Sequence, residues 1–204
     1  MKKAAITCSL LLLGSCLAPR SNGNRYWSEE DAPLVVAYDD NLPQEYVVGL
    51  HQAIHQWNMA INRRLLRMES VEPESPLVNG VIRVSQGTIE VVHLNRWGRV
   101  RRIGQHTPVF VHNSGRMIRS HIIIDTRYSG GSMARKISVH EIGHALGLRH
   151  DEYDPGSVMY PRISGNQFIR TDDVEYVLGY VGQSVPQYRE INFATRNIFK
   201  REED

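Results

Sequence analysis

The chain has 204 residues, of which 41% are hydrophobic and 23% are charged. This composition is close to the average of soluble globular domains, and it argues against both a disordered chain and a membrane protein with several spans. Without Lys2 and Lys3, the only charged residues before position 16, the chain carries 22 basic and 22 acidic residues. Net charge therefore favours neither a nucleic-acid nor a membrane partner.

The first sixteen residues, MKKAAITCSLLLLGSC, have the layout of a secretory signal peptide, with a basic start, a short apolar run and small residues at the end. The apolar run is too short for a stable transmembrane helix. The final LGSC resembles the lipobox of bacterial lipoproteins, whose cysteine is lipidated and begins the mature protein. The resemblance implies a signal peptide over 1–15, a lipid anchor at Cys16 that binds the membrane, and a place in the bacterial cell envelope. By analogy with enteric lipoproteins, Leu17 favours the outer membrane. The alternative is an ordinary signal peptide that is cut nearby.

The next residues predict a tether, a strand and a helix. Residues 16–32 are polar and contain proline, glycine and asparagine, which is typical of a tether. PLVVAYDD (33–40) predicts a buried strand. Apolar residues then recur at helical spacing, and with Asn41-Leu42-Pro43 as a start they predict an amphipathic helix over about 43–67. The segment ESVEPESP after this helix predicts a loop.

Several strands and two helices come next. The segments 80–87 and 88–95 predict strands, and we interpret the residues up to 106 as a long loop. Residues 107–112 and 116–125 predict a hairpin. Helices are expected from Met133 to Gly147 and over 171–181, where Thr171 is a suitable cap. This order predicts an α+β fold with helices packed on one mixed sheet, followed by a C-terminal tail over 183–204.

The helix from Met133 contains the segment HEIGHALGLRH (140–150). On a helix, His140 and His144 are one turn and about 40° apart, so both side chains face one ion. If the helix continued, His150 would lie about 15 Å further along the axis and could not share that ion. Gly147 can adopt the left-handed conformation that ends a helix, so the chain can turn and bring His150 back. Three histidines leave a position for water, which is typical of catalytic zinc sites.

The spacing HExxHxxGxxH resembles the metzincin signature, and SVMYP (157–161) is similar to the methionine turn of that family, with Met159 in the turn. Met-Tyr-Pro and TDDVEYVLGYVG (171–182) are most similar to the matrixin branch. The resemblance covers about 33–182. It implies a metzincin-like domain with a twisted, mixed five-stranded sheet and two long helices, then a small C-terminal part with the methionine turn and one helix.

The same resemblance implies a zinc-dependent endopeptidase with one catalytic Zn²⁺. His140, His144 and His150 would bind the metal, and Glu141 would be the general base. The substrate would be a protein or peptide that pairs with an edge strand, expected near 107–112. Tyr153 and Tyr160 are close enough in sequence to help stabilise the oxyanion.

Two other functions stay open at this point. The first is a catalytically silent lipoprotein that keeps the zinc fold and binds a peptide or partner. The second is an amidase that acts on cell-wall peptide, because a wall cross-link is also an amide. The basic segment RWGRVRR, which ends at Arg102, could contact nucleic acid, acidic lipid or an acidic substrate, but we interpret it as a solvated loop. We expect no nucleic-acid partner and a monomer.

Overall fold

The computed structural model describes residues 25–89, 92–95, 98–111, 114–128, 131–163 and 165–180. The predicted signal peptide, the lipidation of Cys16 and the predicted tail over 183–204 lie outside these residues. Within the described part of the chain, no helix has both the length and the apolar character needed to cross a bilayer.

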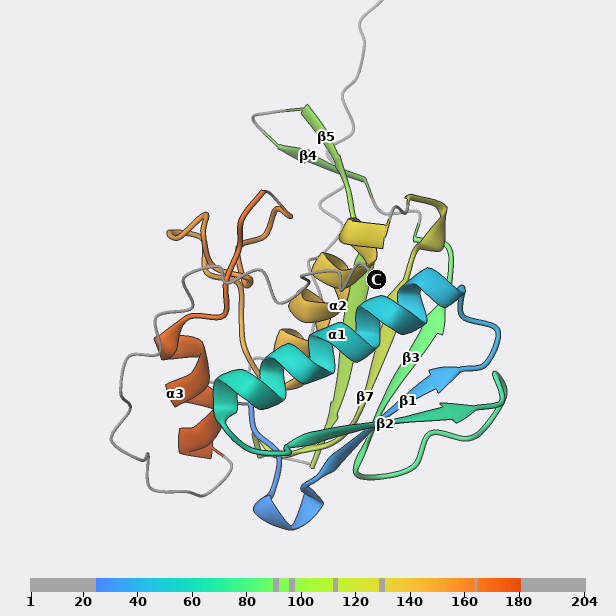
Figure 1. Ribbon diagram of the computed structural model, residues 1–204, viewed down its shortest axis with the longest axis vertical. Helices are drawn as coiled ribbons and strands as arrows, with labels where there is room; N and C mark the ends of the chain where they lie inside the picture. Colours follow the sequence, from blue (N-terminus) through green and yellow to red (C-terminus); the bar gives the residue numbers. More distant parts are fainter. Residues whose placement is uncertain are drawn as a thin grey trace, which may run out of the picture.

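The central element is a five-stranded sheet with the strand order β2-β1-β3-β7-β6 (Figure 1). Its strands are β1 (Leu34–Asp39), β2 (Leu66–Val71), β3 (Val81–Gln86), β6 (Gly104–Phe110) and β7 (Met117–Ile124). The pairings from β2 to β7 are parallel, and β6 is antiparallel to β7. Two short antiparallel strands, β4 (Val92–Asn95) and β5 (Gly98–Arg101), stand apart from this sheet in Figure 1. The predicted mixed five-stranded sheet is confirmed.

The α-helices are α1 (Gln44–Ile61), α2 (Gly131–Ala145) and α3 (Thr171–Tyr180), and the short 3-10 helices are Glu29–Asp31 and Thr126–Tyr128. Helices α1 and α2 cross closely, since a Cβ on Gly49 would lie 2.8 Å from the backbone of Ala134. The buried Trp57 of α1 donates its indole N–H to the carbonyl oxygen of Val139 at 3.0 Å. This contact fixes the register of α2, the helix with the histidine motif, against α1 and the sheet.

The helix predicted over 43–67 ends earlier, at Ile61, and the residues after it form strand β2. Asn62 adopts a left-handed conformation with φ of 53°, which ends the helix. Beyond this point the side chain of Asn58 provides hydrogen-bond partners for backbone groups that the helix no longer pairs. Its oxygen accepts the N–H groups of Leu65 and Leu66, and its amide donates to the Leu66 carbonyl, each at 2.9 Å. The predicted loop after residue 67 is therefore wrong as far as Val71.

The long loop predicted up to residue 106 is also wrong. Residues 98–101 form β5, and β6 already begins at Gly104. The predicted hairpin is confirmed as the pair of β6 and β7, and β6 is an edge strand, as expected for 107–112. Of the strand predicted over 88–95, the part from Val92 to Asn95 is β4, which pairs with β5 outside the main sheet.

Residues 25–32, the described part of the segment expected to be a tether, pack on the domain. The carbonyl oxygen of Tyr26 accepts the N–H of Met117 at 2.7 Å, and Tyr26 forms a parallel bridge with Arg116 just before β7 begins. Trp27 is only 1% exposed and donates its indole N–H to the Ala145 carbonyl at 2.7 Å. One buried tryptophan provides enough apolar surface to dock a segment whose overall composition is polar.

Candidate metal centre

The three motif histidines converge at the end of α2. His140 and His144 lie on the helix, His150 lies beyond it, and one ring nitrogen of each is within 4.8 Å of the others. The Nε2 atoms of His144 and His150 are 3.1 Å apart. The ring of His140 is buried and that of His150 is exposed, so the group opens to solvent on one side. Three nitrogens that converge in this way can hold one metal ion.

The turn that brings His150 back lies at Gly147, as the sequence predicts. Helix α2 ends at Ala145, and Gly147 has a φ of 104°. The N–H of Leu148 donates to the carbonyl of Gly143 at 3.1 Å, which closes the end of the helix. A Cβ on Gly147 would lie 2.4 Å from the carbonyl oxygen of Arg25. Both the backbone conformation and the packing therefore require glycine.

Backbone carbonyls orient two of the rings. The Nδ1 atom of His140 is 2.6 Å from the Val158 oxygen, and the Nδ1 atom of His144 is 2.9 Å from the Leu148 oxygen. A carbonyl oxygen only accepts, so each Nδ1 carries the hydrogen and each Nε2 has a free electron pair. This is how proteins commonly fix the tautomer of a histidine that binds metal.

The pKa of each of the three rings is lowered, which favours the neutral form near pH 7. Burial lowers the pKa of His140 to about 4 and places the pKa of His144 well below its usual value, where the neighbouring His140 lowers it further. His150 is the most exposed of the three, and its pKa is lowered by partial loss of solvent around the ring and by the charge of Arg102. A neutral imidazole is the form that binds a metal ion.

The side chain of Glu141 extends from α2 toward the edge strand β6. The side chain is buried, with only 6% of the residue exposed, and it packs directly against Gly104, where a Cβ would come within 2.1 Å of Oε1. Burial raises the pKa of Glu141 to about 8, and the positive charge of Arg102 acts in the opposite direction. The carboxyl group thus occupies a space that exists because β6 has no side chain at position 104.

Met159 lies directly beneath the motif helix. It is 0% exposed, and a Cβ on Gly143 would lie 2.4 Å from its sulfur, so the glycine between the two helical histidines makes room for it. The Met159 carbonyl accepts the N–H of Asp151 at 3.0 Å. The turn around Met159 therefore contacts both the helix and the segment that carries His150.

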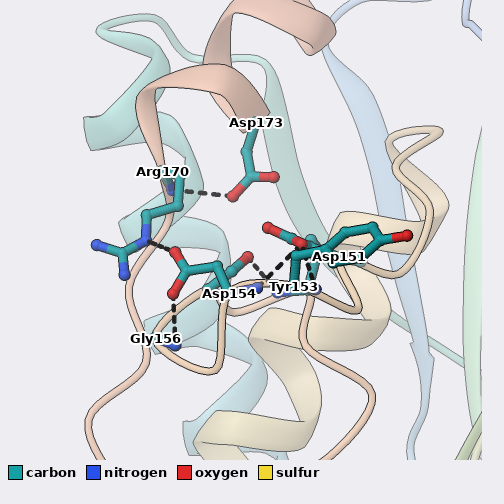
Figure 2. A network of polar contacts seen from close by, with 8 residues as sticks. Asp151, Tyr153, Asp154, Gly156, Arg170 and Asp173 are labelled. Carbon is teal, nitrogen blue, oxygen red and sulfur yellow. Dashed lines mark hydrogen bonds and ion pairs between the residues drawn. The ribbon is translucent and has the colours of Figure 1, made fainter.

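Polar contacts hold the loop after His150 against the start of α3 (Figure 2). Asp151 accepts the backbone N–H of Tyr153 at 3.0 Å, and Asp154 accepts that of Gly156 at 2.8 Å. Arg170 links this loop to α3, since its Nε donates to Asp154 at 2.7 Å and its backbone N–H donates to Asp173 at 2.9 Å. These contacts fix the path of the chain from the third histidine to the last helix.

Sequence reasoning missed one residue beside the centre. The ring of His106 in β6 stacks on that of His144, with 6.2 Å between centroids and an angle of 14° between planes. Its Nε2 is 2.7 Å from the hydroxyl of Ser120, and burial lowers its pKa to about 3. His106 belongs to no motif, so only its place two residues after Gly104 on an edge strand could have indicated it. Of the two tyrosines that were expected to help stabilise the oxyanion, Tyr153 is 96% exposed and Tyr160 is half-buried.

Comparison with protein families identifies this part of the chain. Residues 85–179 match the model of the matrixin family. The matched range contains the edge strand β6, the helix α2 with its histidines, the turn around Met159 and nearly all of α3. A search of curated proteins gave no match.

Proposed function

We propose that the chain, whose residues 85–179 match the matrixin family, is a zinc-dependent endopeptidase of the metzincin type with Glu141 as its general base. The observation that carries the proposal is the convergence of the three histidine nitrogens beside the buried carboxyl of Glu141 and an edge strand. The match to the matrixin family supports the assignment to the metalloproteases.

The donor set suits zinc. Imidazole nitrogens are common zinc ligands, and three protein ligands are typical of catalytic rather than structural zinc sites. In this chain the hydrogen bonds of His140 and His144 to backbone carbonyls leave their Nε2 atoms available, and all three rings are neutral near pH 7. His140, His144 and His150 would hold the ion.

Zinc and the residues around it have separate roles in the proposed reaction. When bound, zinc supplies a Lewis acid that polarises the scissile carbonyl and lowers the pKa of a water molecule toward neutrality. In its ionised form, which the positive charge of Arg102 favours, Glu141 takes a proton from the attacking water and passes it to the nitrogen of the leaving amine. The substrate pairs with β6, whose outer edge has no partner strand among the described residues. Buried Met159 and the carbonyl of Val158 keep the histidines in place.

We also propose a location in the cell and a class of partner, on the basis of the sequence. The LGSC segment supports a lipid anchor at Cys16, which would attach the enzyme to the cell envelope, with the outer membrane as the expected site. We propose a monomer that acts on a protein or peptide and binds no nucleic acid. Cell-wall peptide is the second candidate substrate, because its cross-links are amides in the same environment.

The test is digestion of an unfolded protein such as casein by the purified protein, beside purified wall material, with product analysis by mass spectrometry. We expect internal cleavages of the protein substrate that stop with a zinc chelator and return when zinc is added. Release of wall fragments with intact casein would assign the amidase function instead. Tight peptide binding without cleavage of either substrate would assign the silent binding function.

A further inference from the structure

One face of β6 lines the proposed active centre. Gly104 packs against the Glu141 carboxyl, and the ring of His106 stacks on that of His144. The sheet pairing continues before β6 begins, since the carbonyl of Ile103 accepts the N–H of Asp125 at 2.9 Å. Successive side chains of an extended strand point to opposite faces. We therefore expect Arg102, two residues before Gly104, on the same face as Gly104 and His106.

The position of Arg102 beside the centre follows from the strand that carries it. Arg102 is two residues before Gly104, and a Cβ on Gly104 would lie 2.1 Å from Oε1 of Glu141. Arg102 is itself half-buried, whereas His150 is exposed. We therefore infer that the guanidinium lies on the side of Glu141 that leads toward the exposed His150.

We propose that Arg102 binds an acidic side chain of the substrate next to the scissile bond, so that the enzyme prefers peptides with aspartate or glutamate there. This inference rests on the proposed peptidase function and names its substrate class. The planar guanidinium has a fork of donors that matches a carboxylate, which a neutral amide cannot replace. A peptide paired with β6 advances by about 3.3 Å per residue. Because Arg102 is two residues from Gly104, the acidic residue is expected within two positions of the cleaved bond.

The test uses pairs of peptides that differ only by glutamate or glutamine at each position within two residues of the cleaved bond. The ratio of kcat/KM within a pair is measured for the zinc-loaded protein, for Arg102→Gln and for Arg102→Glu. At one position the wild type should prefer glutamate by about ten- to a hundredfold, the usual range for a charge-assisted contact. Arg102→Gln should bring the ratio close to one, and Arg102→Glu should favour a lysine peptide instead. Arg64→Gln is the matched control, because Arg64 is exposed beside β2 at the far edge of the sheet and its loss should leave the ratio unchanged.

Other outcomes overturn the inference. A ratio near one in the wild type at every position would show that no acidic side chain is recognised. An unchanged ratio in Arg102→Gln, with an equal loss of kcat/KM for both peptides, would assign Arg102 to the support of Glu141. If the wild type cleaves no peptide, the proposed function fails, and fluorescence anisotropy of the same labelled pairs tests the inference separately. A preference for the glutamate peptide that Arg102→Gln removes would then support it, and equal binding would refute it.

Discussion

Replacement of Gly147 by alanine should damage both the stability of the domain and its metal centre. The φ of 104° at this position costs a residue with a side chain about 1–3 kcal/mol. The new Cβ would also lie 2.4 Å from the backbone oxygen of Arg25, and relief of such overpacking typically costs about 1–3 kcal/mol. Since the two effects share one backbone adjustment, we expect Gly147→Ala to lower the free energy of unfolding by about 2–4 kcal/mol.

Two other glycines separate these contributions. Gly80 has a φ of 77° with no atom near its missing Cβ, so Gly80→Ala should show the conformational cost alone, about 1–2 kcal/mol. Gly179 lies in α3 with open space around it, and Gly179→Ala should be neutral or stabilise by up to about 1 kcal/mol, because alanine favours helix. Urea unfolding of the three variants measures these values.

Zinc affinity provides the second measurement. In Gly147→Ala the chain cannot turn as in the wild type, so His150 is displaced and the affinity measured by chelator competition should fall at least about tenfold. Gly80→Ala and Gly179→Ala should bind zinc like the wild type. If Gly147→Ala loses no more stability than Gly80→Ala and keeps wild-type affinity, the assigned role of this turn is wrong.

Three further variants test the surroundings of the centre. Trp27→Phe keeps most of the buried ring but leaves the Ala145 carbonyl without its donor, so urea unfolding should show a loss of about 1–3 kcal/mol, and no loss would mean that residues 25–32 are not docked. Gly104→Ala should displace the Glu141 carboxyl and lower kcat while the zinc content stays at one ion per chain; unchanged kcat would contradict the position of Glu141. Burial raises the folded-state pKa of Asp173 to about 6 from 3.8, so its stabilising contribution is present below about pH 4 and is lost as the pH rises through 6. Asp173→Asn should therefore gain about 1–3 kcal/mol relative to the wild type between pH 4 and pH 8 in urea unfolding, whereas a constant difference would contradict the pKa shift.

The convergence of the three histidines could be predicted because the information for it is local. The spacing of His140 and His144 follows from helix geometry, and the turn at Gly147 follows from the conformational freedom of glycine. The alternation of apolar residues around a turn likewise predicted the hairpin of β6 and β7. The methionine turn also lies where its motif predicts it, since Met159 packs under the helix at Gly143.

The parts that could not be predicted depend on contacts between distant residues. Leu65 and Leu66 continue the apolar period of α1, but the side chain of Asn58 binds their backbone and starts a strand instead. Trp27 sits in a polar segment and is buried only because the end of α2 offers a carbonyl and an apolar surface. His106 approaches His144 through strand pairing, which no local pattern of the sequence contains.

The most direct test of the central claim is a comparison of zinc content and peptide hydrolysis in the wild type and in Glu141→Gln. Glutamine has nearly the same shape as glutamate but cannot accept and pass on a proton, so it removes the proposed general base and leaves the three histidines. We expect one zinc per chain in both proteins and a loss of kcat by about a hundred- to ten-thousandfold in the variant. A variant with bound zinc and near-normal kcat would contradict the role of Glu141, and a wild type that binds no zinc would contradict the metal centre itself.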